Sequence, residues 1–371
     1  SMSEFNRRFL IQAGSLLAPA MWAGRSKPVM AAQEKAPAPS ARLNVTENPF
    51  GPSPAARRAI IACVPDAPYY VENDHTLRDK IGEQENLERD KIALSNGSLD
   101  ALSLLSSDIG RKGHILAPQP TYATHLNYAQ RRGVEVRYVP LTQHAIDLDA
   151  LRRAITPQTA MVYLCNPNNP TGDMLDHAKL LAFCEDVSRT CPVIVDEAYF
   201  ELLPMAEQMT VSSLVHSGHD VIVARTFSKV YGLAGLRIGY ILAQPDRVKQ
   251  LYSLTTTSRN QAGYAAALAS LGDKEYLNGA IRYLTSCRAM IYDICKKNEL
   301  TFLKSHGTFV YVNTLRPAEK MKEALAQRGV DIRVFDAPDY QTWIRVGTAT
   351  PAELKLFGRV LPAALQAVPK A

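Results

Sequence analysis

The sequence TFSKVYGLAGLR occupies residues 226–237 and directly follows Val221–Ala224, an apolar run that is typical of a buried strand. A lysine placed just after such a strand, among hydroxyls and glycines, is partly removed from water. A desolvated amine can be neutral and nucleophilic near neutral pH, as Schiff-base lysines require. The stretch therefore predicts a reactive amine at Lys229. The alternative is a tight turn between strand and helix whose lysine is solvated.

Three polar side chains near this lysine would suit a phosphate group. Thr226 and Ser228 offer hydroxyls, and Arg237 offers a charge-assisted pair. This stretch therefore predicts an anion-binding site beside the amine.

Length and composition restrict the class of protein. A chain of 371 residues is too long for one small core and predicts two packed domains. Hydrophobic residues make up 46% and charged residues 21%, as in soluble globular proteins. The net charge of +6 is modest, and no basic run is interleaved with aromatics, so nucleic-acid binding has little support. The six cysteines lack CxxC or Cys/His spacing, which argues against a metal site and predicts free thiols.

The first 42 residues indicate an export signal and a linker. Arg7-Arg8 precedes a mainly apolar run over residues 9–24, small residues around Ala31 offer a cleavage site, and an Ala/Pro-rich stretch follows. The paired arginines favour twin-arginine export to the periplasm, although the usual spacer after the pair is absent. The apolar run is too short for a membrane span. The alternative is a structural arm that packs on a partner subunit of a cytoplasmic protein.

From residue 91 onward, short apolar strands alternate with helices, which predicts an α/β domain with a mostly parallel sheet. Each polar motif lies just past the carboxyl end of an expected strand, the edge at which open sheets bind ligands. Turn chemistry alone could explain any single one of these residues. As a set they predict one shared site formed by Gly97, Ser98, Asn169, Asp196, Tyr199 and Lys229.

After residue 258 the pattern changes to a long helical stretch and then two strands, around residues 308–312 and 343–346, with a helix between them. We expect a second, smaller α+β domain here. Arg345 lies within the last strand, where a guanidinium is costly to bury without an anion. The alternative for this arginine is a structural salt bridge.

Taken together, these stretches resemble the fold-type I aminotransferases that use pyridoxal phosphate, and most closely the histidinol-phosphate aminotransferase branch. The motifs are NPNNPTG at 166–172, VDEAY at 195–199 and TFSKVYGLAGLRIGY at 226–240. The resemblance runs from about Leu43 to the C-terminus. After the signal-like segment and linker (1–42), which the residues themselves indicate, it implies an N-terminal arm that joins the small domain (43–66), a large cofactor domain (67–257) and a linking helix with the small domain (258–371).

The resemblance also implies roles for matching residues. Lys229 looks like the Schiff-base lysine and general base, Asp196 would face the pyridine nitrogen, and Tyr199 and Asn169 would face the ring oxygen. Tyr122 would stack on the ring. The expected phosphate ligands are Thr226, Ser228, Arg237, the backbone N–H groups of Ser98 and Leu99 after Gly97, and Tyr69 (or else Tyr70) of a neighbouring subunit.

For the substrate, the resemblance implies that Arg345 clamps the α-carboxylate, that Arg333 reads a side-chain phosphate, and that Asn48 lies at the substrate. The expected reactants are an amino donor and a 2-oxo acid acceptor. A homodimer is expected, because Tyr69 is useful only if a second subunit supplies it.

Four positions depart from the family pattern: Thr46, Leu99-Asp100, Ser258-Arg259-Asn260 and Thr308. They weaken histidinol phosphate as the expected substrate and, with export, favour a small or basic amino compound or a tailoring step in secondary metabolism. One alternative reaction is oxidation or elimination on an amino acid such as arginine, for which Thr46, Glu47 and Arg259 would have retuned the pocket. A second alternative is a scaffold without turnover, which the presence of Lys229 and Asp196 disfavours.

Overall fold

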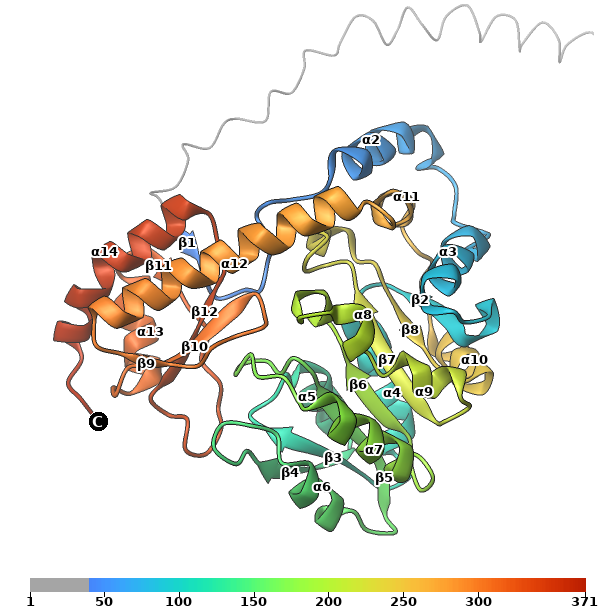
Figure 1. Ribbon diagram of the computed structural model, residues 1–371, viewed down its shortest axis with the longest axis horizontal. Helices are drawn as coiled ribbons and strands as arrows, with labels where there is room; N and C mark the ends of the chain where they lie inside the picture. Colours follow the sequence, from blue (N-terminus) through green and yellow to red (C-terminus); the bar gives the residue numbers. More distant parts are fainter. Residues whose placement is uncertain (1–39) are drawn as a thin grey trace, which may run out of the picture. The chain divides into compact units, whose positions relative to one another are not determined.

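The computed structural model describes residues 40–371 (Figure 1). The expected export signal therefore lies outside the described residues and stays a prediction. Ser40–Ala371 forms a single compact unit, so the domain boundaries expected at residues 66 and 257 also stay predictions. Among the described residues, no helix combines the length and apolar character needed to cross a membrane.

A seven-stranded sheet forms the larger part of the molecule, and its strands follow the order β2-β8-β7-β6-β5-β3-β4. All neighbouring pairs are parallel except those that involve β8. The antiparallel strand β8, which begins shortly after the lysine motif, was not among the strands predicted from sequence. The strands are β2 (Ile92–Ser95), β3 (His114–Gln119), β4 (Glu135–Pro140), β5 (Thr159–Cys165), β6 (Val193–Asp196), β7 (Val221–Thr226) and β8 (Gly239–Leu242).

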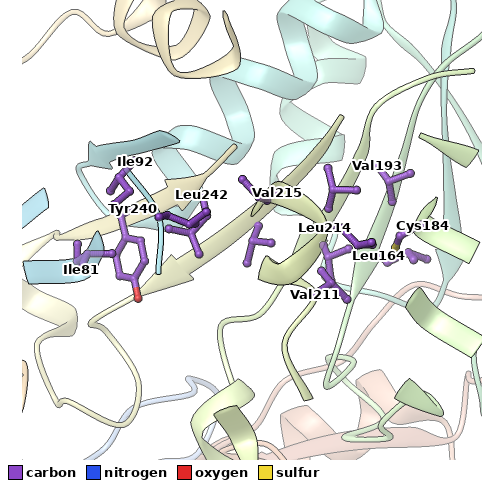
Figure 2. Packing of buried hydrophobic residues seen from close by; sticks show 14 of the residues in the cluster. Ile81, Ile92, Leu164, Cys184, Val193, Val211, Leu214, Val215, Tyr240 and Leu242 are labelled. Carbon is purple, nitrogen blue, oxygen red and sulfur yellow. The ribbon is translucent and has the colours of Figure 1, made fainter. Parts of the chain in front are cut away.

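Helices cover both faces of this sheet, because successive residues of each strand point to opposite sides. Val193 and Val195 belong to one buried cluster, while Ile194 between them belongs to another. Figure 2 shows part of the first cluster, in which strand residues such as Leu164 and Val193 lie near Leu214 of α9. The helices on this side include α3 (His75–Glu85), α7 (His177–Val187) and α9 (Ser212–His216), and those on the other are α4 (Ser98–Gly110), α5 (Thr124–Arg131) and α10 (Pro245–Leu254).

The smaller part combines a three-stranded antiparallel sheet, in the order β12-β10-β9, with a two-stranded parallel one formed by β1 and β11. Its strands are β1 (Ala41–Arg42), β9 (Thr301–Phe302), β10 (Phe309–Asn313), β11 (Val330–Asp331) and β12 (Trp343–Gly347). Because β1 pairs with β11, the first described residues belong to this part. The expected α/β fold, with a mostly parallel sheet covered on both faces and a smaller α+β part that includes the N-terminal segment, is confirmed.

Long helices pack on these smaller sheets and share one apolar core with them. Figure 1 shows the longest, α12, running from beside α11 to the small sheet. The helices not yet given are α2 (Pro54–Ala62), α6 (Leu148–Ala154), α8 (Ala206–Met209), α11 (Gln261–Ser270), α12 (Lys274–Lys297), α13 (Ala318–Ala326) and α14 (Pro351–Ala367). Short 3-10 turns lie at Val64–Asp66, Arg89–Lys91, Phe200–Leu202 and Ala234–Leu236.

Candidate active site

A cavity of about 810 Å³ lies at the carboxyl edge of the large sheet, where residues of the small part also reach it. Parallel strands end at this edge, so the loops after β3, β5, β6 and β7 all open onto it. The sequence-predicted residues that line the cavity are Ser98, Leu99, Tyr122, Asn169, Asp196, Tyr199, Thr226, Ser228, Lys229, Arg237, Arg333 and Arg345.

Lys229 follows β7 by three residues and reaches into this cavity. Its Nζ donates a hydrogen bond of 2.6 Å to the hydroxyl of Thr46. Burial lowers the pKa of Lys229 to about 8, and the nearby positive charge of Arg345 acts in the same direction. A usable fraction of the amine is therefore neutral near neutral pH, as a nucleophile or proton acceptor requires.

Asp196 is the last residue of β6, and its side chain is buried. One carboxylate oxygen accepts a 2.9 Å hydrogen bond from the hydroxyl of Tyr163 on β5, and the other accepts 3.1 Å from the N–H of Ala198. Burial raises the pKa of Asp196 to about 6, while the hydrogen bond from Tyr163 lowers it. The carboxylate is therefore held by two donors and is suited to face a positively charged group.

Arg345 on β12 is buried, with 5% of its surface exposed. Its Nη1 donates 2.9 Å to Oδ1 of Asn169, and its Nη2 donates 2.8 Å to the carbonyl of Asn44. Within residues 40–371 it has no carboxylate partner, so the salt-bridge alternative is wrong for the described chain. Burial lowers the pKa of Arg345 to about 10, and the neighbouring charge of Arg333 adds to this effect. A guanidinium in this state gains free energy from a bound anion.

The groups predicted to hold a phosphate lie around the N-terminus of α4. The hydroxyl of Thr226 donates 2.9 Å to that of Ser228, and Nη1 of Arg237 donates 3.4 Å to the same oxygen. Gly97, the residue before α4, has a φ of +87°, and a Cβ there would collide with the Arg237 guanidinium. Gly97 itself does not line the cavity; its missing side chain lets the arginine approach the helix end. Hydroxyls, guanidinium and free helix N–H groups together form an anion site.

Tyr122 lines the cavity. Behind it lies His125, whose ring centroid is 5.8 Å from that of Tyr122 and 4.2 Å from that of Tyr163. Burial lowers the pKa of His125 to about 3, so this histidine is neutral. Tyr199 and Asn169 are close to each other, at 3.5 Å between Nδ2 and the phenol oxygen.

Besides Gly97, two predicted residues do not line the cavity, Asn48 and Tyr69. Asn48 is buried, and its Nδ2 donates 2.7 Å to the carbonyl of Val230, so the structure uses it to hold the lysine loop rather than to reach a substrate. Tyr69 is 70% exposed, and among the described residues its side chain makes no hydrogen bond to the residues predicted to hold a phosphate. Its expected role therefore depends on a second subunit.

One contributor was not recognised from sequence: Tyr163 lies inside a strand pattern that predicted only core packing. Thr46 and Glu47, named as possible retuning residues, line the cavity, but the hydrogen bonds of Thr46 join residues more than 150 positions away and could not be predicted. Conversely, Arg259 does not face the cavity: its Nη2 donates 2.9 Å to the carbonyl of Leu94, and it lies over the ring of Tyr252. Arg259 as a retuning residue of the pocket was therefore a wrong prediction.

The family model of class I and II aminotransferases matches residues 40–359. The chain belongs to the class I and II aminotransferases. The histidinol-phosphate aminotransferase of Symbiobacterium thermophilum is 35% identical over 332 residues, covering 87% of this chain and 90% of that relative. The enzyme of the same name from Staphylococcus carnosus is also 35% identical, covering 79% of this chain and 83% of its own length.

Solved structures give the same result. The histidinol-phosphate aminotransferase of Sinorhizobium meliloti in complex with pyridoxal-5'-phosphate superposes with a TM-score of 0.83 at 28% identity, covering 88% of this chain and 91% of its own. The aspartate aminotransferase of Thermus thermophilus has a TM-score of 0.75 at 21% identity, a likeness of fold alone.

The resemblance expected from the motifs is therefore confirmed. The aminotransferase is a fold-type I enzyme of the pyridoxal-phosphate-dependent transaminases. Oxidation or elimination is not favoured by these relatives.

Proposed function

We propose that this aminotransferase moves an amino group between a donor that carries an additional anionic group and a 2-oxo acid, with histidinol phosphate as the leading donor. The observation that carries the proposal is the pair Arg333 and Arg345. Both line the cavity that holds Lys229, and their backbones bond each other, with N–O distances of 3.1 Å and 2.8 Å. Neither has a carboxylate partner among residues 40–371.

Two adjoining guanidinium groups suit either of two ligand types. A dicarboxylic amino acid such as glutamate presents two carboxylates, and a phosphorylated amino alcohol presents a doubly charged phosphate. Arg345 donates hydrogen bonds to Asn169 and Asn44, whereas Arg333 is exposed, lies over the ring of Phe335 and makes no side-chain hydrogen bond within residues 40–371. One cavity can therefore accept both donors in turn, as a transaminase must.

The departures from the family pattern weigh less once the structure is known. Arg259 faces away from the cavity, and Thr308 is buried with its hydroxyl unpartnered among the described residues. Of the four positions, Thr46 and Leu99 line the cavity. The doubt about histidinol phosphate that these departures raised is reduced accordingly.

The residues fit pyridoxal phosphate by their chemistry. Arg237, Ser228, Thr226 and the start of α4 would hold its phosphate, Tyr122 would cover a ring face, and Asp196 would meet the pyridine nitrogen. When bound, this cofactor supplies an electron-withdrawing ring that stabilises negative charge on the substrate carbon. Lys229 would bind the cofactor covalently and, as a free amine, take the proton from that carbon at its Nζ. Burial of Asp196 and Lys229 limits the access of bulk water to the proton that Lys229 would take from the substrate carbon.

A spectral titration of the purified enzyme tests the donor. Histidinol phosphate, glutamate and arginine would be added without oxygen, and the visible band of the bound cofactor followed. We expect the first two to bleach it and a 2-oxo acid to restore it. The matched variant Arg333→Gln should weaken the response to histidinol phosphate more than that to alanine, a donor without a second anion. Turnover of arginine that consumes oxygen would contradict the proposal.

We also propose a homodimer in which Tyr69 reaches the phosphate site of the partner. The support is an exposed apolar surface around residues 61–70, in which Tyr69 is 70% and Tyr70 81% exposed, together with Ile61 and Val64. Sedimentation should give twice the mass of the chain. Tyr69→Phe should weaken cofactor binding and Tyr70→Phe should not; a monomer with full cofactor affinity would refute this.

Export to the periplasm is a further proposal, supported by the sequence of residues 1–42. Cell fractionation with Arg7 and Arg8 intact or both changed to lysine tests it. Retention of both forms in the cytoplasm would count against it.

A further inference from the structure

The segment from Leu43 to Asn48 crosses one wall of the cavity, and Thr46 at its centre is 8% exposed. Its hydroxyl oxygen accepts two hydrogen bonds: 2.6 Å from Nζ of Lys229 and 3.2 Å from the phenol of Tyr199. Thr46 therefore contacts two proposed catalytic groups at once.

We propose that Thr46 is a positioning residue: its hydroxyl holds the free amine of Lys229 and the phenol of Tyr199 against this wall of the cavity. The proposal rests on the proposed function only for the meaning of Lys229 as the reacting amine. The contacts themselves are properties of the chain.

The segment cannot easily move Thr46 away, because the backbone on both sides is bonded. The N–H of Gly347 donates 2.7 Å to the carbonyl of Leu43, and Arg345 donates to Asn44. On the other side, the hydroxyl of Thr348 donates 3.1 Å to the carbonyl of Glu47, and Asn48 donates to Val230, the residue after Lys229. Thr46 is therefore fixed with respect to both the lysine loop and the arginine strand.

The hydrogen-bonding capacity of a hydroxyl explains why Thr46 acts as the acceptor toward both Lys229 and Tyr199. Such a group offers two lone pairs and one hydrogen, and both lone pairs of Thr46 are used by Lys229 and Tyr199. A protonated amine is a stronger donor than a neutral one, so an acceptor at this point stabilises the charged form of Lys229. Thr46 therefore offsets part of the burial that lowers the lysine pKa. Its own hydrogen remains available inside the cavity.

The test is the pH dependence with which Lys229 is labelled in full-length protein freed of cofactor. Acetic anhydride would be the probe, and mass spectrometry of the Lys229 peptide the readout. Wild type should show a midpoint at about 8. Thr46→Val keeps the branched shape and loses the acceptor, so its midpoint should fall by about one unit. The charges that act on Lys229, namely Arg345, Asp196, Arg237 and Glu47, stay in place in every variant.

Two variants serve as controls. Thr46→Ser keeps the hydroxyl and should restore the wild-type midpoint. Thr308→Val removes a buried hydroxyl that has no partner among the described residues and should leave the midpoint unchanged. A wild-type midpoint in Thr46→Val, with normal thermal unfolding, would overturn the proposal.

If Thr46→Val fails to fold, Thr46→Ala gives a second hydroxyl-free variant for the same comparison. Failure of the proposed function is separable, because the labelling contains no cofactor or substrate. If the labelling midpoint shifts in Thr46→Val but the wild-type protein does not transaminate, the role of Thr46 is supported and the proposed reaction is not.

Discussion

Two buried arginines show how differently the molecule treats charge in two regions. Arg225, on β7 and away from the cavity, is 1% exposed and pairs with Glu197 at 2.8 Å and Glu85 at 2.7 Å. Burial opposes its charge, yet these carboxylates raise the pKa of Arg225 above its usual range. Arg345, in the cavity wall, is nearly as buried but meets an amide and a carbonyl, and its pKa falls to about 10.

The difference separates a structural charge from a binding charge. The Arg225 cluster contains its own counterions and is complete in the chain. The cavity is lined by the cationic side chains of Lys229, Arg237, Arg333 and Arg345 and by the carboxylates of Glu47, Asp196 and Asp336, yet neither Arg333 nor Arg345 pairs with a carboxylate in residues 40–371. An unbalanced buried charge costs stability, and a ligand that supplies the opposite charge recovers it.

Lys229→Met removes the reactive amine of the cavity and should have the largest effect. Activity should fall at least about a thousandfold, because the nucleophile and base is lost. The cofactor-free protein should gain stability, up to about 3 kcal/mol at neutral pH, because the native lysine pKa is lowered from 10.5 to about 8.

The pH dependence of that gain follows from the direction of the shift. In wild type the unfolded state binds more protons than the native state between the two pKa values, so the free energy of unfolding rises with pH through this window. The advantage of Lys229→Met should vanish above it. Denaturant unfolding at several pH values measures this, and a difference that does not vary with pH would contradict the lowered pKa.

Arg225→Met and Arg345→Met form a matched pair. Removing Arg225 leaves two carboxylates without a partner and should cost about 3–5 kcal/mol of unfolding free energy. Removing Arg345 should cost little stability, while KM for the 2-oxo acid rises about a hundredfold through loss of a charged, bidentate contact. Unfolding curves and steady-state kinetics on both variants measure the two effects. An equal loss of stability in the two variants would contradict the assignment of Arg225 as a structural charge and Arg345 as a binding charge.

Tyr163→Phe tests the hydrogen bond that the Tyr163 hydroxyl donates to Asp196. The variant loses a hydrogen bond to a charged acceptor, worth about 1.5–3 kcal/mol once the carboxylate is ionised. The pKa of Asp196, already raised to about 6, should rise further, so the loss should grow as pH rises through this value. Tyr311→Phe is the control, because its buried hydroxyl has no partner among the described residues. An identical loss in the two variants would show that Tyr163 acts through packing.

Asn48→Ala should have the smallest effect. It loses the hydrogen bond to Val230, which predicts about 1 kcal/mol of lost stability and an unchanged KM for the amino donor. A specific rise in KM would return Asn48 to the substrate site that the sequence analysis assigned to it.

Much of the site could be predicted from sequence because it lies along one sheet edge. Asp196 ends β6 and Lys229 follows β7, and the carboxyl ends of parallel strands meet by construction. The residue types at these positions, a carboxylate and an amine, then predicted the groups that would hold and react with the cofactor. Asn48 was misassigned because an amide in a loop fits a ligand or a backbone carbonyl equally well, and only its contacts decide between them.

By itself, the sequence determined the alternation of strands and helices, the residues past the strand ends and the aminotransferase family. Those features are local: hydrophobic period, turn residues and short motifs. The tertiary structure decided which distant groups meet, as when Arg345 donates to Asn44 across 301 positions and Lys229 to Thr46 across 183. It also decided which buried arginine has a counterion. Protonation and binding depend on desolvation and on neighbouring charge, and both are set by where the folded chain places each group.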